Sequence, residues 1–386
     1  MHRLCFYEFF AGGGMARAGL GPSWTCLFAN DFDAKKGAAY AGNWGADDLR
    51  IGDIHGLKSG DLAGRADLAW ASFPCQDLSL AGAQAGLKGV RSGAFYGFRD
   101  LVAGLAREGR APRILALENV VGALTSNKGA DFVALCTELR NLGYVFGAMT
   151  IDAARFVPQS RPRLFVIAVR REITLCPSLI CDFPHADFTS SALLRAYELT
   201  PENMRRDWRW WALPAPAGSN LRLIDLIEAS PADVDWHSDA QTQKLMSLMD
   251  GVNRAKLDAA LQSGERSIGA VYRRTRMDAA GKKVQRAEVR FDGLAGCLRT
   301  PGGGSSRQFI LVVEHGAVRS RLLSGREAAR LMGLPDDFAL PQRYSDALHL
   351  LGDGVAPPVV RHLAQHLFAP LLAAGARADA AANAAE

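Results

Sequence analysis

The sequence lacks the long hydrophobic runs and the paired cysteine spacings that mark two large classes of protein. No uninterrupted apolar stretch among its 386 residues reaches the roughly 18 to 20 residues that a membrane-spanning helix needs. The first ten residues, MHRLCFYEFF, lack the three-part pattern of a secretory signal. The seven cysteines are odd in number and contain no CxxC pair, which argues against a disulfide framework and a zinc site. We therefore expect a soluble, cytoplasmic protein with no membrane partner and no metal.

Composition and charge place the chain among globular proteins with a basic region. Hydrophobic residues make up 48% of the chain, enough for two or three domains with their own cores, which excludes disorder as the main state. The net charge is +5, but residues 251–330 hold 16 Lys or Arg against 7 Asp or Glu, so the remainder is net negative. A concentrated basic region favours a polyanionic partner, although solvated surfaces are often equally basic.

The first 170 residues predict an α/β domain. Apolar runs alternate with segments of helical period, here residues 98–107 and 131–142. The runs are nearly continuous rather than alternating, as in strands that are covered by helices on both faces. Such sheets are largely parallel and bind ligands at the carboxyl ends of their strands. The expected strands are LCFYEFF, WTCLFAN, ADLAWASF, RILALENV, YVFGAMTI and RLFVIAV.

The pattern changes after residue 170, where prolines and tryptophans cluster and the apolar runs become irregular. Helical period returns at residues 326–332 and 358–372, and the last residues are alanine-rich. We expect a catalytic and cofactor-binding domain at residues 1–170. Residues 171–345 would form a second, smaller domain with a supporting helix, and residues 346–386 a helix returning to the first domain and a frayed tail.

A glycine-rich turn joins the first strand to the first expected helix. The segment Glu8-Phe9-Phe10-Ala11-Gly12-Gly13-Gly14 leads into the helical Met15–Leu20. Glycines at such a turn let a ligand approach the backbone, and the helix start beyond them offers unpaired N–H groups. Alone, the turn is weak evidence, because a purely structural tight turn and a nicotinamide dinucleotide site use similar glycines.

Two carboxylates at strand ends favour an adenosine-bearing ligand. Asp31 follows the second strand in Asn30-Asp31-Phe32, and Asp53 follows the next in Gly52-Asp53-Ile54. A carboxylate at the first of these places can accept both ribose hydroxyls, and one at the second can accept the adenine amino group. Each carboxylate alone could be a helix cap. That interpretation is weaker because the glycine-rich turn and the two carboxylates lie at equivalent places after three successive strands.

A cysteine, a carboxylate and two arginines are expected at the same sheet edge. Phe73-Pro74-Cys75-Gln76 directly follows a strand and precedes a glycine-rich stretch typical of a mobile loop. A lone cysteine is usually a small hydrophobic residue, but this position suits a nucleophile. Glu118 closes another strand in ENV, and Arg161 and Arg163 open one in QSRPR, where a structural salt bridge is the alternative.

Together, these motifs resemble those of the DNA cytosine-5 methyltransferases over nearly the whole chain. They occur in the family's order, as FFAGGG, ND, GDI, FPCQ, GVRSG, ENV, QSRPR, RLLSGREAARLMGLP and GDGV. The resemblance implies an S-adenosylmethionine-dependent methyltransferase fold, Rossmann-like, with a mixed sheet and helices on both faces. A smaller, irregular target recognition domain would follow. S-adenosylmethionine would be the cofactor and double-stranded DNA the partner of a monomeric enzyme, as in restriction-modification, phage or regulatory systems.

The resemblance also implies roles for single residues. Cys75 would add to carbon 6 of a cytosine rotated out of the duplex, because carbon 5 is otherwise too weak a nucleophile to take a methyl group. Glu118 would bond ring nitrogen 3 and the amino group, and either Arg161 or, preferably, Arg163 would bond the carbonyl. The expected cofactor contacts are Phe10, Gly12, Gly14, Asp31, Phe32, Asp53, Ile54, Pro74, Asp353 and Val355.

The sequence departs from the family pattern at two places. Met15 stands where a further glycine is usual, and Asp353 and Gly354 replace the usual Asn and Ser of the late motif. We expect activity nonetheless, because a carboxylate near a sulfonium and an ammonium group is electrostatically tolerable.

Residues 171–318 correspond to the family's target recognition part, and the section 251–318 within them holds most of the excess positive charge of residues 251–330. An RNA cytosine-5 methyltransferase and a non-catalytic DNA-binding protein remain the alternatives; the basic region favours DNA, and an intact Cys75 with Glu118 favours catalysis. The expected DNA contacts are Ser79, Arg91, Arg273, Arg274, Arg276 and Arg307.

Overall fold

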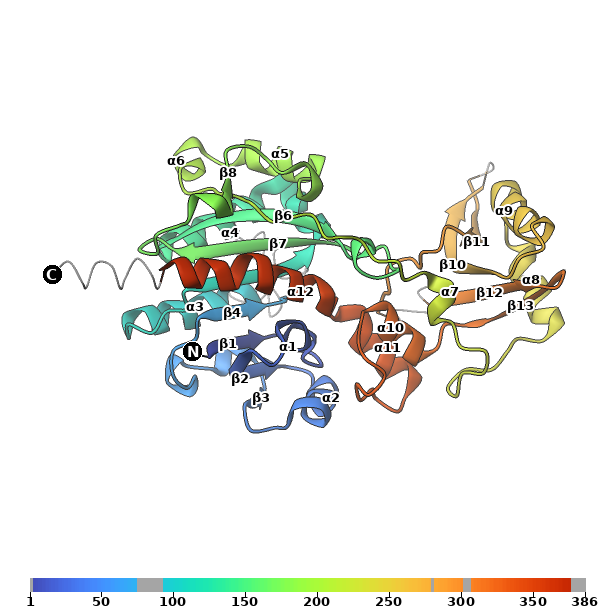
Figure 1. Ribbon diagram of the computed structural model, residues 1–386, viewed down its shortest axis with the longest axis horizontal. Helices are drawn as coiled ribbons and strands as arrows, with labels where there is room; N and C mark the ends of the chain where they lie inside the picture. Colours follow the sequence, from blue (N-terminus) through green and yellow to red (C-terminus); the bar gives the residue numbers. More distant parts are fainter. Residues whose placement is uncertain (1–2, 75–92, 279–280, 301–306, 376–386) are drawn as a thin grey trace. The chain divides into compact units, whose positions relative to one another are not determined.

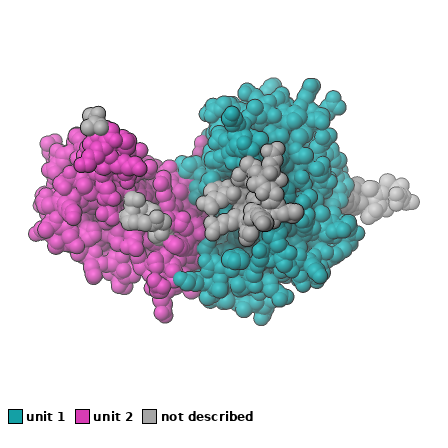
Figure 2. Space-filling model, turned by 180° about the vertical axis from the view of Figure 1, so that it is seen from behind, with its two compact units in different colours: residues 1–152, 162–216, 355–386 teal, residues 153–161, 217–354 magenta. Residues whose placement is uncertain are grey.

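The computed structural model describes residues 3–74, 93–278, 281–300 and 307–375. The chain forms two compact units, coloured separately in Figure 2. None of the helices in these described ranges is long and apolar enough to cross a membrane. Unit 1 comprises Met1–Asp152, Pro162–Pro216 and Val355–Glu386, and unit 2 comprises Ala153–Arg161 and Ala217–Gly354.

Unit 1 is built on a seven-stranded mixed sheet with the strand order β3-β2-β1-β4-β5-β7-β6 (Figure 1). The pairs from β3 to β5 are parallel, whereas β7 lies antiparallel to both β5 and β6. The mixed sheet implied by the family resemblance is therefore confirmed. The strands are β1 (Leu4–Phe9), β2 (Trp24–Asp31), β3 (Leu49–Ile51), β4 (Leu68–Ala71), β5 (Ile114–Val120), β6 (Tyr144–Asp152) and β7 (Pro162–Arg170).

Helices cover both faces of this sheet, which explains the continuous apolar runs of the central strands. One face packs on α3 (Ala94–Arg107) and α4 (Ala130–Asn141), whose aromatic and aliphatic side chains share a core with β1, β4, β5 and β6. On the other face, α12 (Pro357–Leu363) contacts α1 (Met15–Leu20), and Trp70 of β4 meets Phe368 just beyond α12. The helix α2 (Ala34–Trp44) follows β2 and contacts β2 and β3.

Residues 171–216 fold onto unit 1, so the boundary expected at residue 170 lies inside that unit. Trp208 forms a bridge to Phe146 of β6, and the two rings meet edge to face at 5.9 Å. Trp208 and Trp210 thereby join the core of the sheet. This tertiary pairing leaves no periodic signal in the sequence. The segment contains β8 (Ile180–Cys181), α5 (Ser191–Leu199), α6 (Glu202–Arg205) and β9 (Trp210–Trp211).

Unit 2 contains a four-stranded antiparallel sheet in the order β11-β10-β12-β13. The helices α8 (Asp239–Ser247) and α9 (Gly251–Gln262) bury one face of it around residues such as Val271, Val289 and Leu311. The remaining elements are α7 (Leu223–Leu226), β10 (Ser267–Met277), β11 (Lys283–Arg290), β12 (Gln308–Glu314), β13 (Ala317–Leu322), α10 (Gly325–Leu331) and α11 (Tyr344–Asp353).

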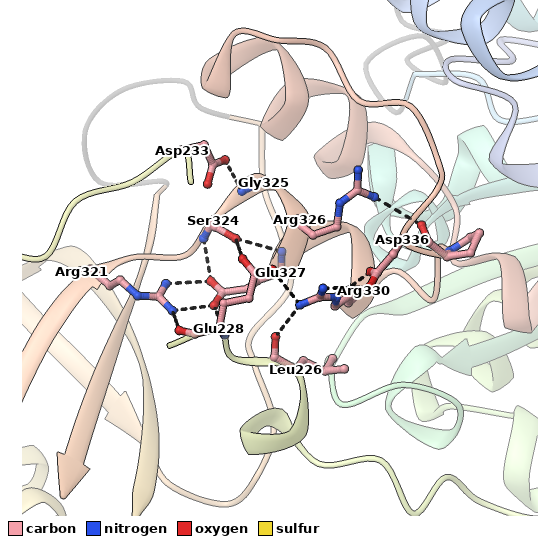
Figure 3. A network of polar contacts seen from close by, with 11 residues as sticks. Leu226, Glu228, Asp233, Arg321, Ser324, Gly325, Arg326, Glu327, Arg330 and Asp336 are labelled. Atoms are coloured by element: carbon pink, nitrogen blue, oxygen red, sulfur yellow. Dashed lines mark hydrogen bonds and ion pairs between the residues drawn. The ribbon is translucent and has the colours of Figure 1, made fainter. Parts of the chain in front are cut away.

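A buried ion pair organises the segment RLLSGRE in unit 2 (Figure 3). Arg321 Nη2 lies 2.6 Å from Glu327 Oε1, and neither side chain is exposed. Ser324 caps α10 by accepting a hydrogen bond from the Glu327 N–H, and the Glu327 carboxylate accepts one from the Ser324 N–H. Because a buried charge without its partner is costly, loss of either member should destabilise unit 2 strongly.

Candidate active site

The turn after β1 has the backbone geometry of a ligand-binding loop. Phe10, Gly12 and Gly14 all have positive φ, at 56°, 56° and 77°. A non-glycine residue in this region is uncommon and is found preferentially at functional sites. A Cβ at Gly12 would meet no atom of the described residues within 4 Å, so the backbone there is open among them, whereas a Cβ at Gly14 would clash with Trp44 Nε1. The turn is therefore open at Gly12 and closely packed at Gly14.

Asp31 connects the end of β2 to this turn. Asp31 is 7% exposed, and its carboxylate accepts hydrogen bonds from the N–H of Gly12 at 2.7 Å and of Asp33 at 2.8 Å. Burial raises the pKa of the Asp31 carboxyl, and the two backbone N–H groups oppose that rise. Each oxygen keeps acceptor capacity beyond its one backbone bond, so Asp31 can also accept from a ligand hydroxyl.

The neighbouring strand ends add an exposed aromatic ring and a second carboxylate. Phe32 follows Asp31 and is 76% exposed, which is unusual for so large an apolar side chain. Asp53 follows β3, is exposed, and accepts a hydrogen bond from the His55 N–H at 3.0 Å, which caps the short helix Ile54–Gly56. Ile54 itself is buried, and the rings of Phe10 and Phe73 meet edge to face at 6.5 Å.

Because β1, β2, β3 and β4 are adjacent, these residues follow one another along a single sheet edge. Pro74, another of the expected cofactor contacts, follows Phe73 beyond β4 and is exposed. The edge combines carboxylate acceptors, aromatic faces and accessible backbone, which is a donor and acceptor set suited to a nucleoside.

Glu118 and Arg163 form an ion pair at the end of β5. The distance from Arg163 Nε to Glu118 Oε1 is 3.2 Å, and the two side chains are 14% and 7% exposed. In the antiparallel register Val120 lies opposite Arg163, so Glu118 and Arg163 are diagonal neighbours on one face of the sheet. The pair therefore places a carboxylate and a guanidinium next to each other at a largely buried position.

Arg161 has a different environment from Arg163. Arg161 is 1% exposed, and its guanidinium donates hydrogen bonds to the carbonyl oxygens of Leu298, Gly352 and Gly354 at 3.0, 2.7 and 2.6 Å. It precedes the start of β7 at Pro162, so the alternation that governs strand residues does not apply to it. The structure thus brings Arg163 to Glu118, and Arg161 holds segments of unit 2 together.

Asn119, which we did not single out from the sequence, joins β5 to the chain leading to Cys75. Its Nδ2 donates a hydrogen bond to the Phe73 carbonyl oxygen at 3.0 Å. The only sequence signal for this contact is its place within the ENV motif. Cys75, Ser79, Arg91 and the glycine-rich stretch expected to be a mobile loop lie outside the described residues, so their roles stay predictions.

Two further residues near the turn carry no signal in the sequence. Glu8, on β1, is 1% exposed, and burial raises the pKa of its carboxyl to about 8. One of its oxygens accepts a hydrogen bond from the Arg17 N–H at 3.4 Å, at the start of α1. Trp44, the last residue of α2, donates from Nε1 to the Gly13 carbonyl oxygen at 3.0 Å.

The late motif is divided between the two units. Asp353 is the exposed last residue of α11 in unit 2, and Val355 is a buried residue of unit 1. Gly352 is closely packed, because a Cβ there would lie 2.7 Å from the Thr300 nitrogen.

The basic residues of β10 separate onto two faces of the unit 2 sheet. Arg274 and Arg276 both pair with Glu288 of β11, at 3.2 and 2.5 Å. Arg273 points the other way, toward the face covered by α8 and α9, and its guanidinium lies 4.9 Å from the centre of the Phe309 ring. Arg307, also in unit 2, lies over the Tyr344 ring at 5.7 Å. Of the three β10 arginines, Arg274 and Arg276 therefore share a face.

Fold and site together describe an α/β protein whose sheet edge carries donors and acceptors suited to a nucleoside, with a carboxylate–guanidinium pair at the end of a strand in the same sheet. The family model for C-5 cytosine-specific DNA methylases matches residues 4–369, and the chain belongs to this family. It is 25% identical over 374 residues to the Type II methyltransferase M.BsuFI of Bacillus subtilis, covering 96% of this chain and 74% of that protein. It is 27% identical over 346 residues to M.NgoFVII of Neisseria gonorrhoeae, covering 89% and 80%.

Solved structures show the same fold at low sequence identity. Dnmt2 of S. pombe aligns with a TM-score of 0.57 and 18% identity, covering 96% of this chain and 99% of that one. A prophage-encoded protein from E. coli, named as a putative DNA modification methyltransferase, aligns with a TM-score of 0.56 and 17% identity over the same shares. The family, the fold class, the methyltransferase activity on cytosine in DNA and the cofactor S-adenosylmethionine, all predicted from the motifs, are thereby confirmed.

Proposed function

We propose that this DNA cytosine-5 methyltransferase works through Cys75 as nucleophile, with Glu118 and Arg163 acting on the base. The observation that supports this assignment is the Glu118–Arg163 pair at 3.2 Å, on the strand whose Asn119 also holds the Phe73 carbonyl. The pair and the segment leading to Cys75 are thus joined through consecutive residues of β5.

Each member of the pair has a task that its chemistry suits. Addition of the Cys75 thiolate to carbon 6 pushes negative charge into the cytosine ring. Glu118 would hydrogen-bond ring nitrogen 3 and the exocyclic amino group, and Arg163 would donate to the ring carbonyl and keep Glu118 oriented. In a mostly buried position these groups are already arranged before the base arrives, so little reorganisation is needed as the charge develops.

The sheet edge from β1 to β3 fits the cofactor. Asp31 would accept the ribose hydroxyls, the exposed ring of Phe32 would stack on the adenine, and Asp53 would accept its amino group. The open space at Gly12 admits the ligand to the backbone. When bound, S-adenosylmethionine supplies a methyl group on a positively charged sulfur. The remaining assigned contacts are Phe10, Gly14, Ile54, Pro74, Asp353 and Val355.

The finer features of the activity are part of the same proposal. The substrate would be double-stranded DNA read in a specific sequence, by a cytoplasmic monomer that needs no metal. The Arg274 and Arg276 face of unit 2 supports a DNA-binding role, because two guanidinium groups lie together on the sheet face opposite α8 and α9. The names of the relatives favour a place in a restriction-modification system.

Bisulfite sequencing of DNA from cells that express the protein tests this proposal, since it reports target and modification together. We expect protected cytosines at one recurrent sequence in duplex DNA, and none with the variant Cys75→Ala. Total RNA from the same cells is sequenced in parallel. Protection in RNA but not in DNA would overturn the assigned substrate, and protection by Cys75→Ala would overturn the nucleophile.

A further inference from the structure

The turn after β1, which belongs to the sheet edge assigned to the cofactor, contains three consecutive glycines. Gly12, Gly13 and Gly14 follow one another, and two of them have positive φ. Glycine has the largest backbone freedom of any residue and loses the most on ordering. A ligand that binds this backbone would have to order all three residues itself unless contacts from elsewhere in the protein already hold them.

Trp44 supplies such contacts from the end of α2. Its Nε1 donates a hydrogen bond to the Gly13 carbonyl oxygen at 3.0 Å. The Gly14 N–H, on the other side of the same peptide unit, donates to the Ala11 carbonyl oxygen at 2.8 Å. The Gly13–Gly14 peptide is therefore held at both its carbonyl and its N–H group. The indole also fills the space that a side chain at residue 14 would need.

The indole is itself held in place by a polar chain. The Arg17 guanidinium lies over the Trp44 ring at 5.1 Å from its centre. Arg17 Nη1 donates to the Asp48 carboxylate and to the Tyr40 hydroxyl, both at 2.7 Å. Asp48, Arg17, Trp44 and Gly13 thus form a continuous series of contacts behind the turn. On the other side, Asp31 holds the Gly12 N–H at 2.7 Å.

We propose that Trp44 is a positioning residue for S-adenosylmethionine, which fixes the Gly13–Gly14 peptide in the conformation that binds the cofactor. Trp44 does not touch the reacting atoms, and it acts through the turn. The proposal rests on the assignment of this turn to the cofactor, made above. A binding loop that is ordered in advance spares the ligand the cost of ordering it, so Trp44 contributes to affinity rather than to the chemical step.

The variant Trp44→Phe removes the N–H donor and keeps an aromatic ring over Gly14 and beneath Arg17. Calorimetry should show the Kd for S-adenosylmethionine rising roughly fivefold, which corresponds to about 1 kcal/mol for one hydrogen bond. KM for the cofactor should rise to a similar extent, while kcat at saturating cofactor and the Kd for DNA change less than about twofold. A general loss of structure would instead lower kcat and DNA binding as well.

The matched control is Trp24→Phe, which makes the same change at a buried tryptophan at the start of β2. It should leave the cofactor Kd unchanged. Asp48→Asn, which loosens Arg17 without altering the indole, should raise the cofactor Kd about twofold and serves if Trp44→Phe does not fold. Unchanged cofactor affinity in Trp44→Phe, or in Asp48→Asn where only that variant folds, would overturn the proposal, as would an equal loss in Trp24→Phe.

Asp31→Ala separates this proposal from the assignment on which it rests. If Asp31→Ala weakens cofactor binding and Trp44→Phe does not, the cofactor edge is correct and the role of Trp44 is wrong. If neither variant weakens binding, the edge itself is misassigned.

Discussion

Asn119 Nδ2 lies 3.0 Å from the carbonyl oxygen of Phe73 and donates a hydrogen bond to it. Its own Oδ1 accepts from the Val120 N–H at 2.9 Å, which fixes the orientation of the amide. Asn119 is 6% exposed and directly follows Glu118. Two neighbouring residues of β5 therefore have linked tasks. Glu118 is assigned to the base, and Asn119 positions the segment that leads to Cys75.

The variant Asn119→Ala should lower kcat about tenfold to a hundredfold, because loss of the hydrogen bond lets the segment at Phe73 shift relative to Glu118. Cofactor affinity should stay within about twofold, since the Asn119 hydrogen bond goes to the Phe73 carbonyl and Phe73 is not one of the assigned cofactor contacts. Single-turnover methylation of duplex DNA and calorimetry measure the two effects. Asn141→Ala, at an exposed position at the end of α4, is the control. A normal kcat in Asn119→Ala would show that the hydrogen bond to Phe73 has no catalytic consequence.

Asp31→Ala should weaken S-adenosylmethionine binding by roughly tenfold or more, because a charged hydrogen-bond partner is worth about 1.5 to 3 kcal/mol. The variant also frees the Gly12 N–H, which Asp31 holds at 2.7 Å. Calorimetry gives the Kd directly, and the exposed Asp47→Ala is the matched control. Normal cofactor binding by Asp31→Ala would mean that the ribose is held elsewhere.

The buried carboxyl of Glu8 should make the free energy of unfolding depend on pH. Burial raises its pKa to about 8 in the folded protein, whereas an unfolded glutamate titrates at about 4.3. Between these values the folded state holds one more proton than the unfolded state, so stability falls as the pH rises. Below the lower value both states are protonated and the dependence disappears.

Glu8→Gln replaces the neutral carboxyl by a neutral amide and should remove this loss of stability, which is on the order of a few kcal/mol between pH 5 and pH 8.5. Urea unfolding of the variant and the parent at both pH values measures the difference, with the exposed Glu265→Gln as control. Parallel pH dependences in Glu8→Gln and the parent would show that Glu8 titrates normally in the folded state.

Charge reversal of Arg274 and Arg276 together should weaken DNA binding and leave cofactor binding unchanged. If each arginine neutralises one phosphate, the slope of log affinity against log salt should fall in magnitude by about 0.9 for each of the two phosphates. Arg273→Gln should affect DNA binding less and stability more, because Arg273 lies over Phe309 on the face that α8 and α9 cover. Equal losses of DNA affinity at all three positions would contradict this division.

The sequence predicted the parts of the site that lie at the ends of regular strands. Strands covered on both faces are nearly continuous apolar runs, so their ends, and with them Asp31 and Glu118, could be located. The short edge strand β3 has no such run, since Arg50 and Ile51 are exposed. It could be inferred only from Asp53, which follows it.

Contacts between distant segments could not be predicted in this way. Arg161 and Arg163 are two residues apart, and the sequence pattern gives no reason to expect different environments for them. Their environments differ because β7 begins at Pro162, so that Arg163 lies within the strand and Arg161 lies before it. Trp208 joins the core of unit 1 through a bridge to Phe146, which no local periodicity announces. Trp44 likewise reaches Gly13 across 31 residues. By contrast, the alternation within β10 was available in the sequence and would have separated Arg273 from Arg274.

The most direct test of the mechanism is covalent trapping on DNA that carries 5-fluorocytosine at the target. After Cys75 has added to carbon 6 and the methyl group is on carbon 5, release requires a base to remove the proton from carbon 5, and fluorine cannot leave as a cation. A complex that survives a denaturing gel should therefore form, and only when S-adenosylmethionine is present.

In this trapping measurement Glu118→Gln should form the same complex more slowly, because its amide no longer offers a carboxyl group to ring nitrogen 3. Cys75→Ala should form none. A Cys75→Ala protein that still forms the adduct or still methylates DNA would contradict the account.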